Sequence, residues 1–149
     1  MGNGTILMAD DNPRTAEKFG LVLRANGIDN EIVVARDGVE ALDYLFGTGD
    51  HAGSDTSFMP RLMLLDLSMP RMGGLEVLRR LREDERTKLL PVVVLTSSTD
   101  PQDIVEAYRA GANSYVDKLS DVPWPELVPL IARYWLDMNI SAQGSHPTA

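Results

Sequence analysis

The sequence predicts one α/β domain in which a five-stranded parallel sheet is doubly wound, with helices on both faces. Short apolar runs alternate with longer segments of helical periodicity along the chain, and this alternation is typical of parallel sheets. One run, residues 62–65, is continuously apolar between turn-forming residues, as expected for a strand buried on both faces. The length of 149 residues suits one domain. We place it at residues 1–140 and expect a disordered polar tail at residues 141–149.

Local signals place the strands and helices in chain order. Asn12, Asp37 and Asp100 offer side-chain oxygens that can cap the first, second and fourth helices. Gly27 and Gly111 are expected to end the first and fourth helices, because glycine adopts the left-handed conformation found at helix ends. The expected strands are residues 5–9, 31–35, 62–65, 90–96 and 114–116.

The final helix is apolar on more than one side. We expect one stripe to pack against the sheet, namely Leu127, Leu130, Ile131, Tyr134, Trp135 and Met138. A second apolar set recurs at four-residue spacing on a different side, namely Val128, Ala132 and Leu136, with Trp124 and Ile140 at the two ends. A monomer is expected to leave part of this surface exposed. Pro129 is expected to kink this helix or to mark its start. Because exposed apolar patches mark contacts and twofold dimers commonly cover them, we predict a homodimer through this helix.

Polar side chains follow four of the expected strands. Asp10 and Asp11 follow the first strand, Asp66 the third and Lys118 the fifth, while Thr96 ends the fourth. The carboxyl ends of parallel strands meet at one edge of a sheet, where ligands bind. Three carboxylates gathered there repel one another unless a cation lies among them, and an all-oxygen set favours Mg²⁺. A nearby ammonium and hydroxyl would complete a site for a transferred phosphoryl group.

Composition excludes several classes of protein. The chain has no cysteine, so a disulfide scaffold and a thiolate metal site are excluded. Its 14 lysines and arginines against 22 aspartates and glutamates give a net charge of −8, which is poorly suited to binding nucleic acid. No apolar run is long enough to span a membrane and no signal segment is evident. We therefore expect a cytoplasmic protein that binds neither nucleic acid nor membrane.

The ordered set of motifs resembles the receiver domain of two-component response regulators, of the chemotaxis-regulator type, over about residues 5–138. The motifs are Asp10–Asp11, residues 64–70 with Gly73–Gly74, residues 94–97 and residues 115–118. The resemblance implies a flavodoxin-like strand order 2-1-3-4-5 with five helices. It also implies a phosphoprotein that signals through protein–protein contacts.

The resemblance further implies a role for each matching residue. Asp66 is implied to be the nucleophile that accepts a phosphoryl group from a phosphohistidine of a sensor histidine kinase. Asp11 is implied to ligate Mg²⁺ directly and Asp10 mostly through water. Asp66 and the backbone carbonyl of Ser68 complete the protein ligands.

Three further residues are implied to serve the phosphorylated state. Thr96 would hydrogen-bond the phosphoryl oxygens and Lys118 would pair with one of them. Tyr115 would change its rotamer as Thr96 shifts, which is the switch of the family, although an aromatic at this position could also be plain core. Such a protein is not an enzyme in the usual sense, because it catalyses at most its own phosphorylation and dephosphorylation.

One departure from the family pattern points to a subgroup within the family. Leu119 follows Lys118 where the family usually has proline, so we expect the next loop to run differently. Stand-alone regulators that serve phytochrome-type kinases also lack this proline. They resemble this chain in a long loop, here residues 47–60, and in a final helix that contains a tryptophan, here Trp135. About ten residues follow this helix, too few for a DNA-binding output module, and a phytochrome-type kinase is the expected partner.

Three other functions fit these residues less well. A receiver-like scaffold that is never phosphorylated would not need the complete acidic set. A phosphatase of the dehalogenase-like class also uses an aspartate nucleophile, but it needs a second aspartate where Ser68 stands. A flavodoxin-like cofactor binder needs a phosphate-binding loop after the first strand, where Asp10 and Asp11 would repel a phosphate.

Overall fold

The computed structural model describes residues 4–54, 56 and 59–143. The described residues form one parallel sheet in the order β2-β1-β3-β4-β5, as predicted. The strands are β1 (Ile6–Ala9), β2 (Ile32–Ala35), β3 (Leu62–Leu65), β4 (Val92–Thr96) and β5 (Ser114–Asp117). The α-helices are α1 (Pro13–Ala25), α2 (Gly38–Phe46), α3 (Gly74–Glu83), α4 (Pro101–Ala110) and α5 (Trp124–Arg133). A 3-10 turn, η1 (Gly49–His51), lies in the expected long loop, and a π-helical turn, η2 (Tyr134–Met138), continues α5.

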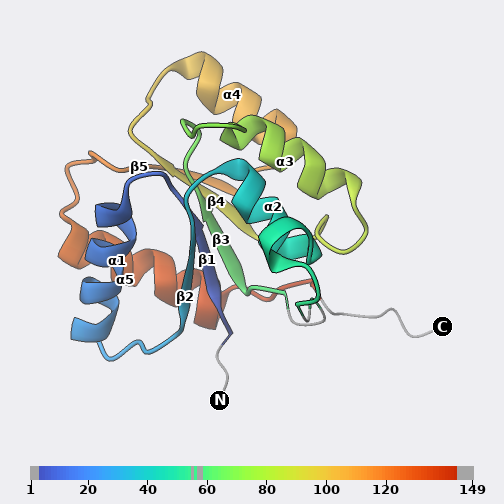
Figure 1. Cartoon of the computed structure of the whole chain (residues 1–149). Coiled ribbons are helices and arrows are strands. Elements are labelled where there is room, and N and C mark those ends of the chain that lie inside the picture. Colours follow the sequence, from blue (N-terminus) through green and yellow to red (C-terminus); the bar gives the residue numbers. More distant parts are fainter. Residues whose placement is uncertain (1–3, 55, 57–58, 144–149) are drawn as a thin grey trace.

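The sheet lies between two helix layers. Helices α1 and α5 pack together on one face, whereas α2, α3 and α4 cover the other (Figure 1). Alternating side chains of the central strands serve the two layers, because successive residues of a strand point to opposite faces. Leu7 and Met63 belong to the core under α2–α4, and Ile6 and Leu62 to the core under α1 and α5. Both faces of the central strands are therefore buried, as the apolar runs predicted.

The predicted helix caps are confirmed. The side chains of Asn12, Asp37 and Asp100 accept hydrogen bonds from the backbone N–H groups of the first turns of α1, α2 and α4. Gly111 ends α4 with a positive φ of 111°, and Gly27 follows the end of α1 with φ 72°. Residues 55, 57 and 58 of the expected long loop, and residues 144–149 of the expected tail, lie outside the described residues.

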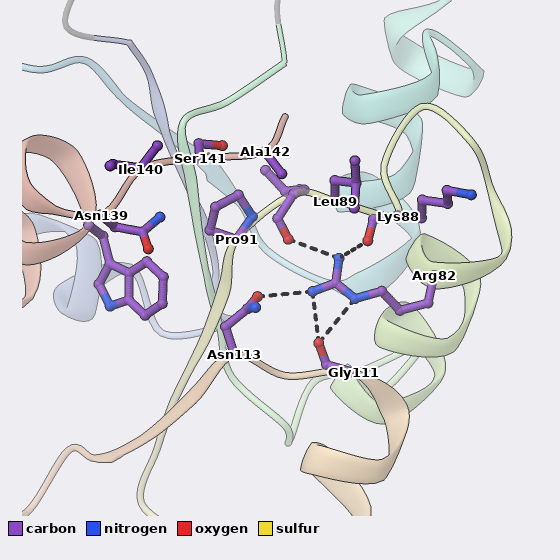
Figure 2. Close-up of a pocket in the computed structure, with 12 residues that line it drawn as sticks. Arg82, Lys88, Leu89, Pro91, Gly111, Asn113, Asn139, Ile140, Ser141 and Ala142 are labelled. Atoms are coloured by element: carbon purple, nitrogen blue, oxygen red, sulfur yellow. Dashed lines mark hydrogen bonds between the residues drawn. The ribbon is translucent and has the colours of Figure 1, made fainter. Parts of the chain in front are cut away.

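A half-buried arginine holds together the chain segments where β4 and β5 begin. Arg82 of α3 donates hydrogen bonds to the carbonyl oxygens of Leu90 and Gly111 and to Oδ1 of Asn113 (Figure 2). Burial lowers the pKa of the Arg82 guanidinium. The cavity drawn in Figure 2 lies beside these bonds. Because it opens where the strands begin, it lies away from the edge that bears the strand-end carboxylates.

The faces of the final helix differ from the prediction. Val128, Ala132 and Leu136, from the set that we expected to be partly exposed, are buried against α1 and the sheet. The expected core residues Leu130, Tyr134 and Met138 are instead 64%, 48% and 70% exposed. Apolar residues cover more than one side of this helix, so its periodicity left open which side faces the core. Ile131, Trp135 and Leu127 do contact the core, as expected.

Two smaller expectations for this helix are also resolved. Helix α5 begins at Trp124 and contains Pro129 in its interior, so this proline does not mark the helix start. Trp124 is half-buried against the core, whereas Ile140 is 95% exposed, as expected. Within the described residues, the helices are too short or too polar for any of them to cross a membrane.

The corrected faces predict different outcomes for Leu130 of α5 and Leu136 of η2. Leu136→Ala should lower the free energy of unfolding by about 2–4 kcal/mol, because it leaves a cavity beside α1. Leu130→Ala, on the exposed face, should change it by no more than about 0.5 kcal/mol. Urea denaturation of both variants measures the difference. Equal losses, or a larger loss for Leu130→Ala, would contradict the assigned faces.

Candidate functional site

The strand register brings the polar strand-end residues level with one another. Ala9 of β1 pairs with Leu65 of β3, so Asp10 and Asp66 leave neighbouring strands at the same height. The Asp66 N–H donates to the carbonyl oxygen of Ala9 over 2.9 Å. Lys118 is positioned in the same way, because its N–H donates to the carbonyl oxygen of Thr96 over 2.8 Å. These residues therefore converge at the carboxyl edge of the sheet.

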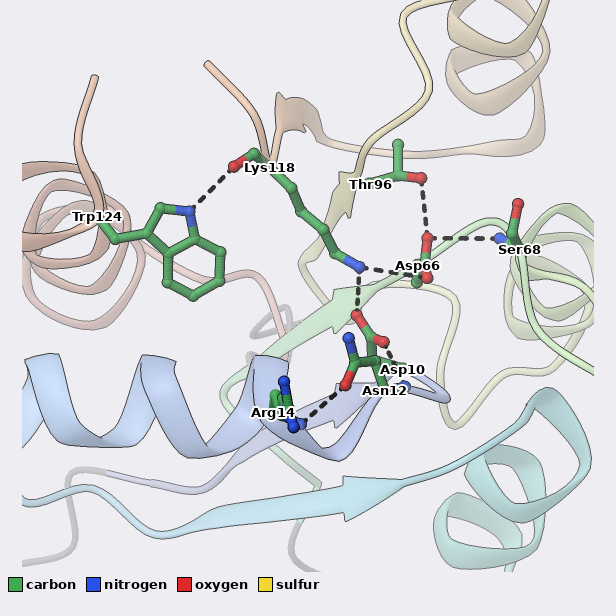
Figure 3. Close-up of polar contacts among 8 residues, drawn as sticks. All are labelled: Asp10, Asn12, Arg14, Asp66, Ser68, Thr96, Lys118 and Trp124. Atoms are coloured by element: carbon green, nitrogen blue, oxygen red, sulfur yellow. Dashed lines mark hydrogen bonds and ion pairs between the residues drawn. The ribbon is translucent and has the colours of Figure 1, made fainter. Parts of the chain in front are cut away.

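One ammonium lies between two carboxylates at this edge (Figure 3). Lys118 Nζ is 2.6 Å from Asp10 Oδ2 and 3.4 Å from Asp66 Oδ2. The hydroxyl of Thr96 donates to Asp66 Oδ1 over 2.8 Å. The backbone N–H of Ser68 also points to this oxygen, at 3.4 Å. Each oxygen of Asp66 thus has a donor from a different strand or loop.

Burial makes this arrangement electrostatically demanding. Asp10 is 2% exposed and Asp66 is 7% exposed, and charges removed from water are costly unless they are paired. Burial alone would lower the pKa of the Lys118 ammonium, but Asp10 and Asp66 outweigh it and raise this pKa above its ordinary value. Lys118 is therefore held in its charged form as the counter-ion of both carboxylates.

The same carboxylates could hold a metal ion. Asp10, Asp11 and Asp66 each offer an oxygen, and these oxygens all lie within 4.8 Å of one another. Asp11 is exposed, whereas the other two are buried. Three carboxylates against one ammonium leave an excess of negative charge. Hard divalent cations prefer all-oxygen sites of this kind, so the donor set fits such an ion.

The loop after Asp66 is tied to the rest of the fold. A Cβ at Gly74 would collide with the carbonyl oxygen of Asp66 and with Leu67, so this helix start requires glycine to approach Asp66. Arg71 has a left-handed φ of 64° and binds both oxygens of Asp37, at 2.8 and 3.1 Å. This hydrogen-bonded pair lowers the pKa of Asp37. The Arg71–Asp37 ion pair thus joins the loop after Asp66 to the start of α2.

Sequence reasoning missed two residues next to the site. Arg71 was not singled out, because its pairing with Asp37 depends on two loops that no spacing rule connects. Trp124 was expected to supply exposed apolar surface, but its indole N–H donates to the carbonyl oxygen of Lys118 over 3.0 Å. The signal available in the sequence was a tryptophan six residues after the lysine.

Tyr115 is the predicted site residue that lies apart from the acidic cluster. Its hydroxyl donates to the carbonyl oxygen of Ser98 over 2.9 Å, in the loop that leaves β4 directly after Thr96. The side chain is half-buried, and burial raises the pKa of its hydroxyl. Tyr115 thus contacts the β4–α4 loop and not the carboxylates.

Comparisons with known proteins agree with this geometry. A family model described as response regulator receiver domain matches residues 6–124. The probable methanogenesis regulatory protein FilR2 of Methanothrix harundinacea is 40% identical over 137 residues, which cover 91% of this chain and 86% of FilR2. Response regulator Rcp1 of Synechocystis is 33% identical over 135 residues, which cover 89% of this chain and 88% of Rcp1.

Two solved structures of such relatives superimpose closely. The phosphorylated cyanobacterial phytochrome response regulator RcpA gives a TM-score of 0.83 at 31% identity, over 94% of this chain and 99% of RcpA. The Mn²⁺-bound form of Rcp1 gives a TM-score of 0.81 at 31% identity, over 93% of this chain and 98% of Rcp1.

The shared ammonium predicts how the metal-free protein responds to loss of Lys118. Lys118→Met should lower the free energy of unfolding by about 3 kcal/mol, because two buried carboxylates lose their counter-ion. Adding Mg²⁺ should then raise the melting temperature of the variant more than that of the unmodified protein. Lys88→Met is the matched control, since Lys88 forms an exposed ion pair with Glu85 worth less than about 1 kcal/mol. Equal Mg²⁺ responses in all three proteins would contradict the assigned electrostatics.

Proposed function

The chain belongs to the response regulator receiver family, and from this membership we propose that Asp66 accepts a phosphoryl group from a phosphohistidine of a sensor histidine kinase. One observation supports the choice of Asp66 above the others. Its two oxygens already face the Thr96 hydroxyl and the Lys118 ammonium, at 2.8 and 3.4 Å, which are the groups that would stabilise a phosphoryl group bound there.

The reaction follows from this arrangement. A carboxylate oxygen of Asp66 attacks phosphorus, so that a new O–P bond forms while the N–P bond to the kinase histidine breaks. The histidine leaves with the electron pair of that bond. Lys118 can pair with the negative charge on the phosphoryl oxygens, and Thr96 can donate a hydrogen bond to one of them. The protein acts as a phosphoacceptor, with no reaction beyond its own phosphorylation and dephosphorylation.

The proposed cofactor is Mg²⁺. Asp10, Asp11, Asp66 and the backbone carbonyl of Ser68 would hold it, with Asp10 acting mostly through water. When bound, the ion neutralises charge on the phosphoryl oxygens. The clustered carboxylate oxygens support this assignment, and so does the Mn²⁺ form of the relative Rcp1. Mg²⁺ is favoured because it binds through a few carboxylates and keeps several waters.

Thr96 and Tyr115 are proposed to transmit the phosphorylated state. A shift of Thr96 toward the phosphoryl group would pull on the loop that follows β4. Tyr115 is hydrogen-bonded to the carbonyl oxygen of Ser98 in that loop, so its side chain would move with the loop. The signal would therefore leave the site on the side of α4 and β5.

The proposed kinase partner is a phytochrome-type photoreceptor. The likeness of the chain to RcpA supports this partner, as does Leu119 in place of proline. The reaction would take place in the cytoplasm, where a kinase draws on ATP. With a net charge of −8, the protein is expected to signal by contacting proteins and not nucleic acid. The phosphatase alternative is not favoured, since Ser68 stands where that class needs an acid.

Phosphorylation of Asp66 can be tested directly. Incubation with Mg²⁺ and acetyl phosphate should produce one acyl phosphate that maps to Asp66, and Asp66→Asn should take up none. Asp103→Asn, on α4, is a control that leaves the strand-end carboxylates intact. Mass spectrometry after trapping the acyl phosphate locates the label. Label on another residue, or label retained in Asp66→Asn, would refute the assignment.

We also propose that the chain forms a homodimer through the exposed face of α5 and η2. Leu130, Tyr134 and Met138 lie on this face, and Ile140 follows it. These exposed apolar side chains replace the buried set that we first expected to form the contact. A twofold pairing would cover them and would give phosphorylation an interface to alter.

The exposed face predicts which substitution separates the dimer. Leu130→Glu should yield monomers, because it places a charge within the apolar contact. Leu21→Glu, at a similarly exposed leucine of α1, should leave the dimer intact. Light scattering at several concentrations, with and without phosphorylation, gives the masses. A monomeric unmodified protein at tens of micromolar in both states would rule out this dimer.

A further inference from the structure

The peptide group that joins Lys118 to Leu119 is held at both ends by side chains. The indole N–H of Trp124 donates to the carbonyl oxygen of Lys118 over 3.0 Å (Figure 3). The N–H of Leu119 donates to Oδ1 of Asp117 over 2.8 Å. Because Leu119 is not proline, this N–H is available to form the second bond. The peptide group that follows Lys118 is therefore fixed by the side chains of Trp124 and Asp117.

Trp124 is itself fixed by helix α1. Its ring meets the fully buried ring of Phe19 edge to face, with centroids 6.3 Å apart. Lys18 Nζ lies 4.5 Å from the centroid of the indole ring, within range of a cation–π contact. Helix α1 thus helps to orient the indole, whose N–H reaches the Lys118 carbonyl.

Lys118 is consequently held on three sides. Its backbone N–H is bound by β4, its carbonyl by Trp124, and its ammonium lies at Asp10 and Asp66. A lysine side chain has many rotamers, so a well-fixed backbone is needed if the ammonium is to reach a defined point. The exposed Leu119 side chain adds no packing of its own at this point.

We propose that Trp124 is a positioning residue for Lys118: its indole N–H fixes the carbonyl at the base of the lysine and so aims the ammonium at the phosphoryl group. This inference rests on the proposed phosphorylation of Asp66. Trp124 does not touch the reacting atoms. It acts through Lys118, so the contacts that α1 makes with the indole affect the rate of phosphorylation.

Trp124→Phe removes the donor and keeps an aromatic ring against Phe19. Trp135→Phe is the matched control, because the other tryptophan of the chain packs against Tyr134 and not against the lysine. Initial rates of labelling by acetyl phosphate are measured at saturating Mg²⁺, together with the Mg²⁺ dissociation constant from thermal titration. Trp124→Phe should label about three- to tenfold more slowly, the usual effect of one hydrogen bond, with its Mg²⁺ affinity unchanged.

Tryptophan fluorescence is measured alongside these rates, in a variant that keeps the hydrogen bond from Trp124 to Lys118. In Trp135→Phe, Trp124 is the sole tryptophan, and its fluorescence should change when acetyl phosphate and Mg²⁺ are added, because the phosphoryl group and the ammonium that pairs with it alter the charge near the indole while the Lys118 carbonyl stays bound. The fluorescence of Trp124→Phe, from Trp135, should not change.

Several results would overturn the assignment. An unchanged labelling rate in Trp124→Phe would do so. Equal losses of labelling rate and Mg²⁺ affinity would also do so, because they indicate that the whole site has loosened. Unchanged Trp124 fluorescence in a protein that does become labelled also contradicts it. If neither the unmodified protein nor Trp135→Phe takes up label, the proposed function fails and the role of Trp124 fails with it.

Discussion

A single lysine shared by two buried carboxylates is the interaction on which the functional edge of this protein depends. The parallel register of β1 and β3 puts Asp10 and Asp66 at one height, and β4 delivers Lys118 to the same place through its pairing with β5. The fold therefore forces like charges together and supplies one opposite charge. The remaining negative charge suits the edge to a cation and, under the proposed function, to a phosphoryl group once that cation is present.

The loops around this edge restrict how far its members can move. Gly74 lets α3 begin directly against the backbone of Asp66, and the Arg71–Asp37 bridge ties the following loop to the start of α2. Trp124 fixes the lysine from the side of α1. By contrast, Tyr115 is joined to the β4–α4 loop by one hydrogen bond. This hydrogen bond connects the loop after Thr96 to β5, as the proposed switch requires.

The sequence was informative where local chemistry decides the structure. Strand runs, helix caps at Asn12 and Asp100, and the strand-end residues all follow from patterns within a few positions. The rotation of α5 could not be predicted, because Leu130 and Leu136 are equally apolar and tertiary packing alone distinguishes them. Arg71 and Trp124 were missed for a related reason: their partners come from other loops, and neither contact has a fixed spacing. Long-range side-chain pairing is thus where sequence reasoning failed.

Transfer from a phosphorylated kinase tests the central claim, that these strand ends form a phosphoacceptor site. A phytochrome-type histidine kinase carrying a radiolabelled phosphohistidine is mixed with the chain in Mg²⁺, and both proteins are followed over time. We expect label to leave the kinase and to reach the chain as an alkali-labile acyl phosphate, and chelation of Mg²⁺ to stop the transfer. Label that stays on every kinase tested, while the chain remains folded and binds Mg²⁺, would contradict the account.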